Sequence, residues 1–303
     1  MTGEIVIRVS ALIFIAGLGW ITGFVLNLRS RDISVLLIYI ISPVVIFISI
    51  LQSPADWSYL GYSAAAFSTA SLAAGIAYLV GGVLWQDGRV NLFAFAGGTG
   101  NTGYFGLPLV FAVFNERQVA IAVFIIIGLN IYEFTCGYFI TARAFLTIKE
   151  SLKCIVRLPV IYAAIAGMAF KALKIAPGEI VLSTLSNFKG AYSVLGMMVI
   201  GITLAAYRKI ELDRSFLLAT IGWKHIVYPL VGIGFFHILT GVSARTLAVI
   251  ALMLASPMAA NTVVVANTLG VHPEKVALAV MVSTLLAIIT TPLAMAWVNG
   301  LTG

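Results

Sequence analysis

Charged residues are scarce in this sequence. Asp, Glu, Lys and Arg together occupy 10% of its 303 positions, whereas hydrophobic residues occupy 61%. A surface that faces water requires far more charge, so an ordinary soluble globular protein is excluded. The chain has only two cysteines, and because Cys136 lies in an apolar run and Cys154 in a polar connection, a disulfide framework is excluded as well. We therefore expect lipid to surround most of the chain.

The residue patterns of common enzymes and of nucleic-acid-binding proteins are also missing. The three histidines are widely separated, and no zinc-ligand spacing, nucleophile elbow or phosphate loop occurs. The net charge is +7, but the basic residues stand singly instead of alternating with aromatic residues. Gly98–Gly103 fits the dinucleotide pattern G-x-G-x-x-G, but it lies in an apolar run and Glu116 follows too closely. We expect no enzyme, cofactor, metal or nucleic-acid partner.

Long apolar runs follow one another along the chain. A helix needs about 20 such residues to cross the hydrocarbon core of a bilayer. Ten runs approach this length, at positions 5–26, 33–51, 59–84, 93–114, 119–142, 158–173, 187–206, 215–239, 246–269 and 276–298. The first run exceeds the apolar part of a signal peptide and lacks a clear cleavage site, so we expect it to be retained. The pattern predicts an all-α polytopic membrane protein with ten transmembrane helices.

The basic residues are distributed unevenly over the predicted connections. Eleven of the 18 lysines and arginines lie in connections that follow odd-numbered spans, and five lie on the other side. Cytoplasmic loops carry an excess of Lys and Arg. The bias therefore predicts a multi-pass protein of the cell membrane with both termini extracytoplasmic, and an even number of spans agrees with that orientation.

The longest cytoplasmic connection, at 144–157, divides the predicted spans into two sets of five. We expect one five-helix repeat at 1–143 and a second at 158–303, in opposite orientations because each contains an odd number of spans. A short similarity supports this division, since Gln118–Val123 (QVAIAV) matches Lys275–Val280 (KVALAV). Chance matching of apolar sequence is the alternative explanation.

Two predicted spans contain residues that do not continue a helix. Gly97–Pro108 has five glycines in its first ten residues and ends in proline, and Ser256–Asn267 begins Ser-Pro. Proline removes a donor and clashes with the preceding turn, and each glycine weakens a helix by about 1 kcal/mol relative to alanine. Opened backbone survives in lipid only where it is buried or lines a cavity. The alternative is that the glycines allow close packing and the prolines only bend the helices.

These interruptions predict a binding site near the middle of the membrane. Freed N–H groups at the start of a half-helix favour an anion, and Asn and Thr side chains add polar groups. Freed carbonyl groups offer the alternative of a bound cation. The candidate residues in the two interruptions are Asn101, Thr102, Gly103, Gly106, Pro108, Pro257, Asn261 and Thr262.

Three ionisable residues inside the predicted spans are candidates for function, because a charge in lipid is costly. Glu133 lies near the centre of its span, one turn after Asn130, and either carries a proton when an anion binds or is a permanently protonated structural residue. Lys189 and Lys224 lie towards the ends of their spans. Each either extends to the membrane surface or attracts anions.

The sequence resembles the auxin efflux carrier family, which includes the plant PIN carriers and bacterial relatives. The family pattern Asn-Thr-x-x-x-Gly-x-Pro-Leu is found here as Asn101, Thr102, Gly106, Pro108 and Leu109. Further similarities in the same order are Pro43, Arg157-Leu-Pro159, Lys224 five residues before Pro229, Pro257, and Val271-His-Pro273. The long hydrophilic loop of many plant members is absent, as in the short bacterial forms.

The resemblance implies two inverted five-helix repeats that form a scaffold domain and a transport domain. The fourth and ninth helices would cross at their prolines, with elevator-type alternating access and a homodimer as the assembly. Substrate and crossover roles would belong to Asn101, Thr102, Pro108, Pro257 and Asn130. Glu133 and Lys189 have no match in the plant pattern, so the resemblance does not extend to plant-type substrate choice.

The function expected from these observations is secondary transport of a small organic anion. Glu133 adds the expectation that this transport is coupled to protons. The bacterial relatives are linked with malonate and malate, so the resemblance implies a mono- or dicarboxylate, malate-, malonate- or auxin-like. A sodium-coupled organic-anion symporter of the bile-acid type is the alternative. A membrane sensor or enzyme that binds ligand without moving it is the third interpretation.

Overall fold

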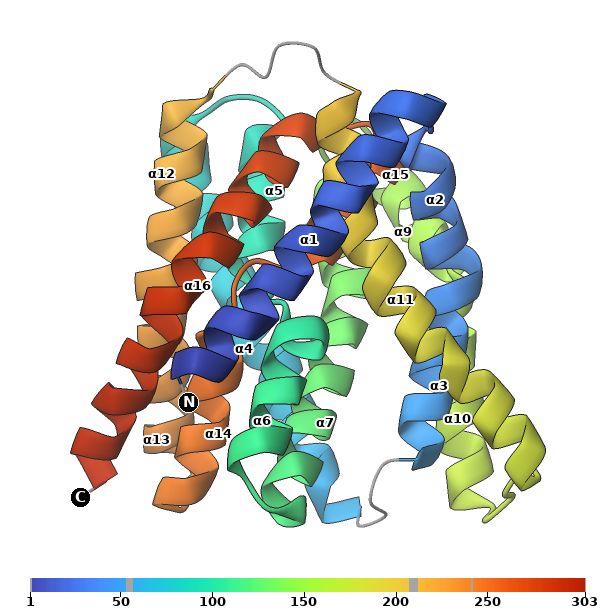
Figure 1. Ribbon diagram of the computed structural model, residues 1–303, viewed down its shortest axis with the longest axis vertical. Coiled ribbons are helices and arrows are strands. Elements are labelled where there is room, and N and C mark those ends of the chain that lie inside the picture. Colours follow the sequence, from blue (N-terminus) through green and yellow to red (C-terminus); the bar gives the residue numbers. More distant parts are fainter. Residues whose placement is uncertain (1, 53–56, 207–211, 241, 303) are drawn as a thin grey trace.

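The computed structural model describes residues 2–52, 57–206, 212–240 and 242–302. Within these ranges the chain forms helices joined by short connections and contains no strand (Figure 1). The prediction of an all-helical protein is thereby confirmed. The helices are α1 (Thr2–Leu26), α2 (Ser30–Leu36), α3 (Ser42–Gln52), α4 (Leu60–Leu84), α5 (Arg89–Gly97), α6 (Leu107–Val113), α7 (Glu116–Tyr132), α8 (Tyr138–Ala142), α9 (Ile148–Val156), α10 (Pro159–Ala172), α11 (Glu179–Ala205), α12 (Arg214–Gly222), α13 (Tyr228–Thr240), α14 (Ala244–Leu254), α15 (Ala260–Leu269) and α16 (Pro273–Thr302).

Four π-helical segments and one short 3₁₀ turn complete the helical structure. The segments are η1 (Leu37–Ile41), η2 (Trp57–Tyr59), η3 (Thr102–Gly106), η4 (Glu133–Gly137) and η5 (Trp223–Val227), of which η2 is the 3₁₀ turn. Three of the π-helical segments join two α-helices into one continuous rod, as η4 joins α7 to α8. Single π turns inside helices are often found at functional sites.

Six helical rods of the described chain are long and apolar enough to cross a membrane. They correspond to the predicted spans at 33–51, 59–84, 119–142, 187–206, 215–239 and 276–298. The bent pair α9 and α10 raises the number to seven if it is one span. Two of the other predicted spans, at 93–114 and 246–269, are the two that the sequence predicts to be interrupted, so their helices are too short for this criterion.

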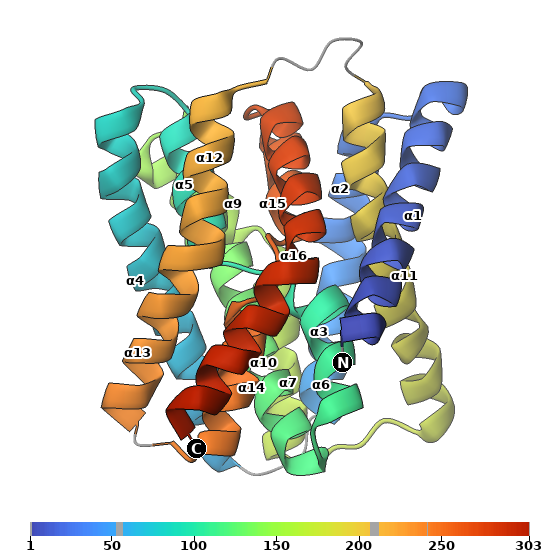
Figure 2. The same ribbon diagram turned by 60° about the vertical axis from the view of Figure 1, so that its left-hand side comes forward.

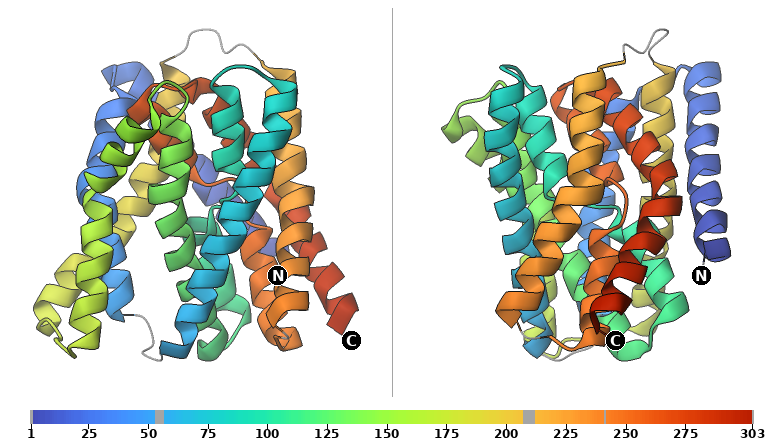
Figure 3. Two further views of the ribbon diagram at one scale, coloured as in Figure 1. Left: turned by 180° about the vertical axis from the view of Figure 1, so that it is seen from behind. Right: turned by 90° about the vertical axis from the view of Figure 1, so that its left-hand side faces the viewer.

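The helices form two groups, which α15 and α16 connect because both also pack against α11. In the first group α1 packs along α11, and α3 packs against both α10 and α11. In the second group α4 packs against α5 and α7, and α14 packs against α7, α13 and α16. Figure 3 shows the bundle from two further sides. The α1–α11 contact is close because Gly19 lies against the Met198 backbone and Gly201 against the Ala16 carbonyl, where no side chain fits.

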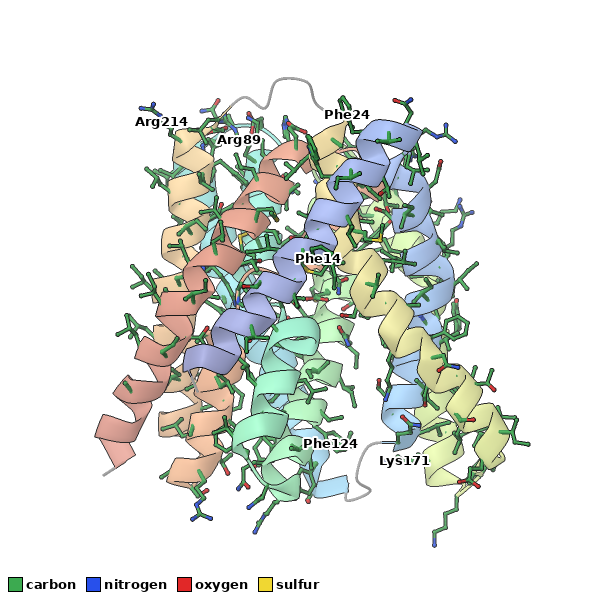
Figure 4. The ribbon with its side chains drawn as sticks, in the orientation of Figure 1. Phe14, Phe24, Arg89, Phe124, Lys171 and Arg214 are labelled. Atoms are coloured by element: carbon green, nitrogen blue, oxygen red, sulfur yellow. The ribbon has the colours of Figure 1, made fainter. Side chains whose placement is uncertain are left out.

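One end of the bundle gathers the charge pairs of three connections. Asp213 accepts hydrogen bonds from Arg89 Nη1 at 2.9 Å and Lys275 Nζ at 2.8 Å, and it caps α12 through the Phe216 N–H at 3.1 Å. Burial raises the pKa of Asp213, but these donors outweigh burial and hold the pKa well below its usual range. Figure 4 shows Arg89 and Arg214 at this end and Lys171 near the opposite end.

The predicted connection at 144–157 contains the helix α9. Thr147 and Glu150 form a capping box at its start, since the Thr147 N–H donates to Glu150 Oε2 at 2.8 Å and the Glu150 N–H donates to Thr147 Oγ1 at 3.3 Å. Figure 3 (right) shows α9 projecting from the bundle at the end where α12 begins.

Candidate functional site

Both predicted interruptions leave the helical conformation near the middle of the bundle. Between α5 and η3 the chain is not helical at residues 98–101, and between α14 and α15 it is not helical at residues 255–259. The two interruptions touch, because the Asn101 N–H donates to the Pro257 carbonyl at 2.7 Å. In Figure 2, α5 and α15 lie in the upper half, and α6 and α14 in the lower half. The chain therefore enters the crossing from opposite ends of the bundle.

The helix ends that lead into the crossing are capped by one segment, Trp223–Tyr228. Trp223 Nε1 donates to the Gly97 carbonyl at 3.0 Å, and Tyr228 Oη donates to the Gly98 carbonyl at 3.3 Å. Lys224 Nζ donates to the Leu254 carbonyl at 3.3 Å. Carbonyl groups at the C-terminal end of a helix carry partial negative charge. Three donors, one of them cationic, therefore satisfy the ends of both α5 and α14.

Lys224 is enclosed on this side of the crossing. Lys224 is 1% exposed, and its Nζ lies 4.2 Å from the centre of the Tyr228 ring. A Cβ atom on Gly100 would lie 2.6 Å from Nζ, so a larger residue at that position would require the ammonium to shift. The structure does not place Lys224 in the wall of the cavity described next, and its side chain does not reach the membrane surface.

A cavity of about 980 Å³ lies in front of the two helix starts, those of η3 and α15, that lead away from the crossing. Gly100 to Gly103 and Ala259 to Asn261 form its inner end. Its walls come from α7 in the second helix group and from α3 and α11 in the first. Gln52 and Asn115 line its other end, at the ends of α3 and α6 that lie low in Figure 1. The cavity thus runs from the crossing towards the end of the bundle that is opposite Arg89 and Arg214 in Figure 4.

Glu133 connects the crossing to the cavity. The residue is 2% exposed, and its carboxylate accepts hydrogen bonds from Thr99 Oγ1 and, at 2.5 Å, from Asn261 Nδ2. Asn261 Nδ2 also donates to Tyr192 Oη at 2.6 Å. Because Tyr192 belongs to α11, this chain of polar groups joins the two helix groups. Asn261 Oδ1 is buried and has no hydrogen-bond partner among the described residues.

The side of the crossing opposite the cavity is held closed by polar contacts of α15 with α2 and α11. Ser30 Oγ donates to Asn267 Oδ1 at 2.9 Å, and Asn267 Nδ2 donates to Thr203 Oγ1 at 2.7 Å. Ser30 begins α2, Asn267 belongs to α15 and Thr203 to α11. The cavity therefore opens towards one end of the bundle, while α15 seals against α2 and α11 towards the other.

The structure brings together some of the residues that the sequence singled out and separates others. The predicted residues that line the cavity are Asn101, Thr102, Gly103, Asn130, Glu133, Lys189 and Asn261. Pro257 lies in the interruption behind them, and Thr262 Oγ1 turns back to the Ala259 carbonyl at 2.6 Å. Gly106 packs against Ser256 and Met253 instead of facing the cavity, since a Cβ there would lie 2.8 Å from Ser256 Oγ.

Pro108 differs from the expected proline-to-proline crossing. It falls in the first turn of α6, seven residues after Asn101, whose N–H makes the backbone contact with Pro257. The crossing therefore joins an asparagine to a proline. A proline is well suited to the first turn of a helix because its missing N–H would have no partner there. The side chain of Pro108 lies outside the described residues.

Several residues of the site were not predicted from the sequence. Tyr192, Thr99 and Gln52 act through partners that are distant in sequence, and Trp223 and Tyr228 cap helix ends that no local pattern connects to them. The sequence did indicate Trp223 and Tyr228, because both lie near Lys224 and carry a polar group on an aromatic ring. Such side chains usually find a hydrogen-bond partner when buried.

Comparison with sequence models of protein families identifies a family for this chain. The sequence model of a family described as Membrane transport protein matches residues 142–295, which is half of the chain. The matched part contains α15 and the Trp223–Tyr228 segment. No sequence among the curated proteins matches the chain.

Proposed function

This chain belongs to the membrane transport protein family, the auxin efflux carrier family, and from this premise we propose that it carries a small organic anion across the membrane as a secondary transporter. Members of this family are transporters and not enzymes. The observation that carries the proposal is the cavity of about 980 Å³ that ends at the starts of η3 and α15.

The polarity of the crossing supports an anion as the substrate. Helix starts present N–H groups with partial positive charge, and here they are accompanied in the cavity wall by Asn101, Thr102 and Asn261. Lys189 adds an ammonium to the same wall. Glu133 is the one carboxylate among the residues that line the cavity, and a proton on it would remove the repulsion of an anionic ligand.

The arrangement of the interruptions supports ten spans in two inverted five-helix repeats, at 1–143 and 158–303. The two interrupted helices enter the crossing from opposite ends, and α1 begins in the same half of the bundle in which α16 ends (Figure 1). The basic residues at the end that includes Arg89 and Arg214 support a cytoplasmic location for that end (Figure 4). Both chain termini would then be extracytoplasmic, in a cell membrane.

The two helix groups support alternating access of the elevator type. The cavity lies between α3 and α11 on one side and α7 and the crossing on the other, and the Ser30–Asn267–Thr203 contacts close the cytoplasmic side. We infer that the second group moves against the first during transport, so that these contacts break when the site opens to the cytoplasm.

Proton coupling through Glu133 fits the site better than sodium coupling. A sodium ion would need freed carbonyl oxygens as ligands, but Lys224 already donates to the Leu254 carbonyl beside the crossing. Trp223 and Tyr228 donate to the carbonyls of Gly97 and Gly98. The protein thus satisfies these carbonyls with its own donors, and no described carboxylate except Glu133 lines the cavity.

Flux measurements in reconstituted vesicles test the proposal. We expect uptake of at least one C2 to C5 carboxylate or aryl acetate, driven by a proton gradient or by exchange and unchanged when choline replaces sodium. Loss of flux in choline would instead establish a sodium symporter. Saturable binding without any flux, in correctly inserted protein, would establish a sensor or an enzyme and overturn the proposal.

A further inference from the structure

Lys189 is a second cationic group of the site, distinct from Lys224 in its surroundings. It lies on α11, lines the cavity and is only half-buried, and Nζ donates to Gln52 Oε1 at 2.8 Å. None of the ion pairs among the described residues involves Lys189. An ammonium that is partly removed from water and lacks a carboxylate partner favours the arrival of an anion.

The position of Lys189 relative to the crossing follows from the geometry of α11. Tyr192 lies three residues later on this helix, so the two residues share a helix face with a rise of roughly 4.5 Å between them. Tyr192 Oη contacts Asn261 Nδ2 at 2.6 Å, which places Tyr192 level with the start of α15. The backbone of Lys189 therefore lies about one helix turn farther from the crossing than that of Tyr192, and its Nζ contacts Gln52 at the open end of the cavity.

Gln52 holds the lysine in this position. It is the last residue of α3, and its amide nitrogen donates to Ser186 Oγ at 2.8 Å while its oxygen accepts from Lys189. Ser186 and Lys189 are both on α11, so Gln52 bridges one turn of that helix. A lysine side chain loses considerable rotamer freedom when it is fixed in this way, and that loss is already made before a ligand binds.

From this geometry we propose that Lys189 is the second anchor of the anion site and selects substrates with two carboxylates over substrates with one. The inference rests on the transport function proposed above. The first carboxylate binds at the starts of η3 and α15, beside Asn101 and Asn261, and the second binds Lys189. Dicarboxylates of three to five carbons, whose carboxyl carbons are roughly 2.5–5 Å apart by standard bond lengths, sample the separation that the two anchors require.

Binding measurements on purified protein test this assignment. The affinities of malonate, succinate and glutarate are compared with those of propionate, butyrate and valerate in wild type, Lys189→Gln and Lys189→Arg. We expect wild type to bind the dicarboxylates more tightly, and Lys189→Gln to weaken them by at least about tenfold while it changes the monocarboxylates less than about threefold. Lys189→Arg keeps the charge and should retain most of the preference.

Lys174→Gln is the matched control. It removes the same charge from an exposed residue between α10 and α11, outside the cavity, and should leave all six affinities unchanged. If Lys189→Gln weakens both ligand classes equally, or neither, the assignment of Lys189 is wrong while anion binding stands. If wild type binds and transports no carboxylate at all, the proposed function itself fails, and the assignment falls with it.

Discussion

The two faces of the crossing use the same backbone interruption in opposite ways. On the face where α5 and α14 end, here called the closed face, the helix ends meet three donors from one segment, Trp223, Lys224 and Tyr228. On the open face the starts of η3 and α15 line a cavity of about 980 Å³. The protein supplies its own donors to the negative helix ends, whereas the positive helix starts face open volume.

The packing of glycines shows the same difference. A Cβ atom on Gly98 would meet the Ala70 carbonyl and lie 2.5 Å from Tyr132 Oη, whereas a Cβ on Gly103 would meet no atom within 4 Å. These two glycines are five residues apart in one interruption. The first is required by the close approach of other chain segments, and the second leaves free volume in the cavity. Tight packing and free volume thus belong to different residues of one short segment.

The largest difference between the faces is expected from the two lysines. Lys224→Met removes the buried ammonium and leaves the Leu254 carbonyl without its donor and Glu133 without a nearby cation. We expect a loss of about 3–5 kcal/mol in the free energy of unfolding, because a buried carbonyl without its donor costs about 1–3 kcal/mol and the desolvated cation–π contact with Tyr228 contributes about 2 kcal/mol. Denaturant titration of the purified protein in mixed micelles, followed by tryptophan fluorescence, measures this loss.

Lys189→Met is the matched control for that experiment. It also removes an ammonium from a predicted span, but from a half-buried residue whose one described partner is Gln52. We expect its unfolding free energy to fall by less than about 1 kcal/mol. Equal losses in the two variants would show that the faces do not differ as described.

The second difference is expected from the glycines of the first interruption. Gly98→Ala should lower the free energy of unfolding by about 2–3 kcal/mol, because the Ala70 backbone cannot move away without disturbing α4. Gly103→Ala should have no such effect and should raise stability by up to about 1 kcal/mol, since alanine favours helical backbone and the added methyl group has room. The same denaturant titration compares the unfolding free energies of the two variants. A larger loss for Gly103→Ala than for Gly98→Ala would reverse the assignment of the closed and open faces.

The sequence predicted the interruptions themselves because glycine and proline act locally. The predicted span at 59–84 agrees with α4, and Gly97–Pro108 and Ser256–Asn267 contain all the non-helical residues of the two interruptions except Ala255. The partners across the crossing could not be predicted. Whether Lys224 faces lipid, water or a helix end depends on how η5 packs against α5 and α14, and no spacing in the sequence encodes that contact.

Some of the residues that line the cavity could be named from the sequence, and others could not. Asn101, Asn130, Glu133 and Asn261 could be proposed because polar residues in apolar spans need a partner or water. Tyr192 has a hydroxyl but is common as an interfacial residue in membrane helices, so its contact with Asn261 follows only from the packing of α11 beside α15.

The smallest expected change in stability concerns Glu133, which lies between the two faces. Glu133→Gln keeps the size of the side chain, and its amide can donate to Asn261 Oδ1, the buried oxygen without a described partner, once the Asn261 amide turns over. We therefore expect a change of less than about 1 kcal/mol in the free energy of unfolding.

The effect of Glu133→Gln on transport should nonetheless be clear. If the proton on Glu133 moves with the substrate, wild-type uptake rises as the external pH falls from 8 to 5, and uptake by the glutamine variant is the same at every pH. Initial rates in vesicles with a fixed internal pH, with substrate kept at one ionisation state by choice of a strong acid, measure the two profiles. Parallel profiles would make Glu133 a structural residue that fastens η4 to α15, and the open face would then bind its anion without a coupled proton.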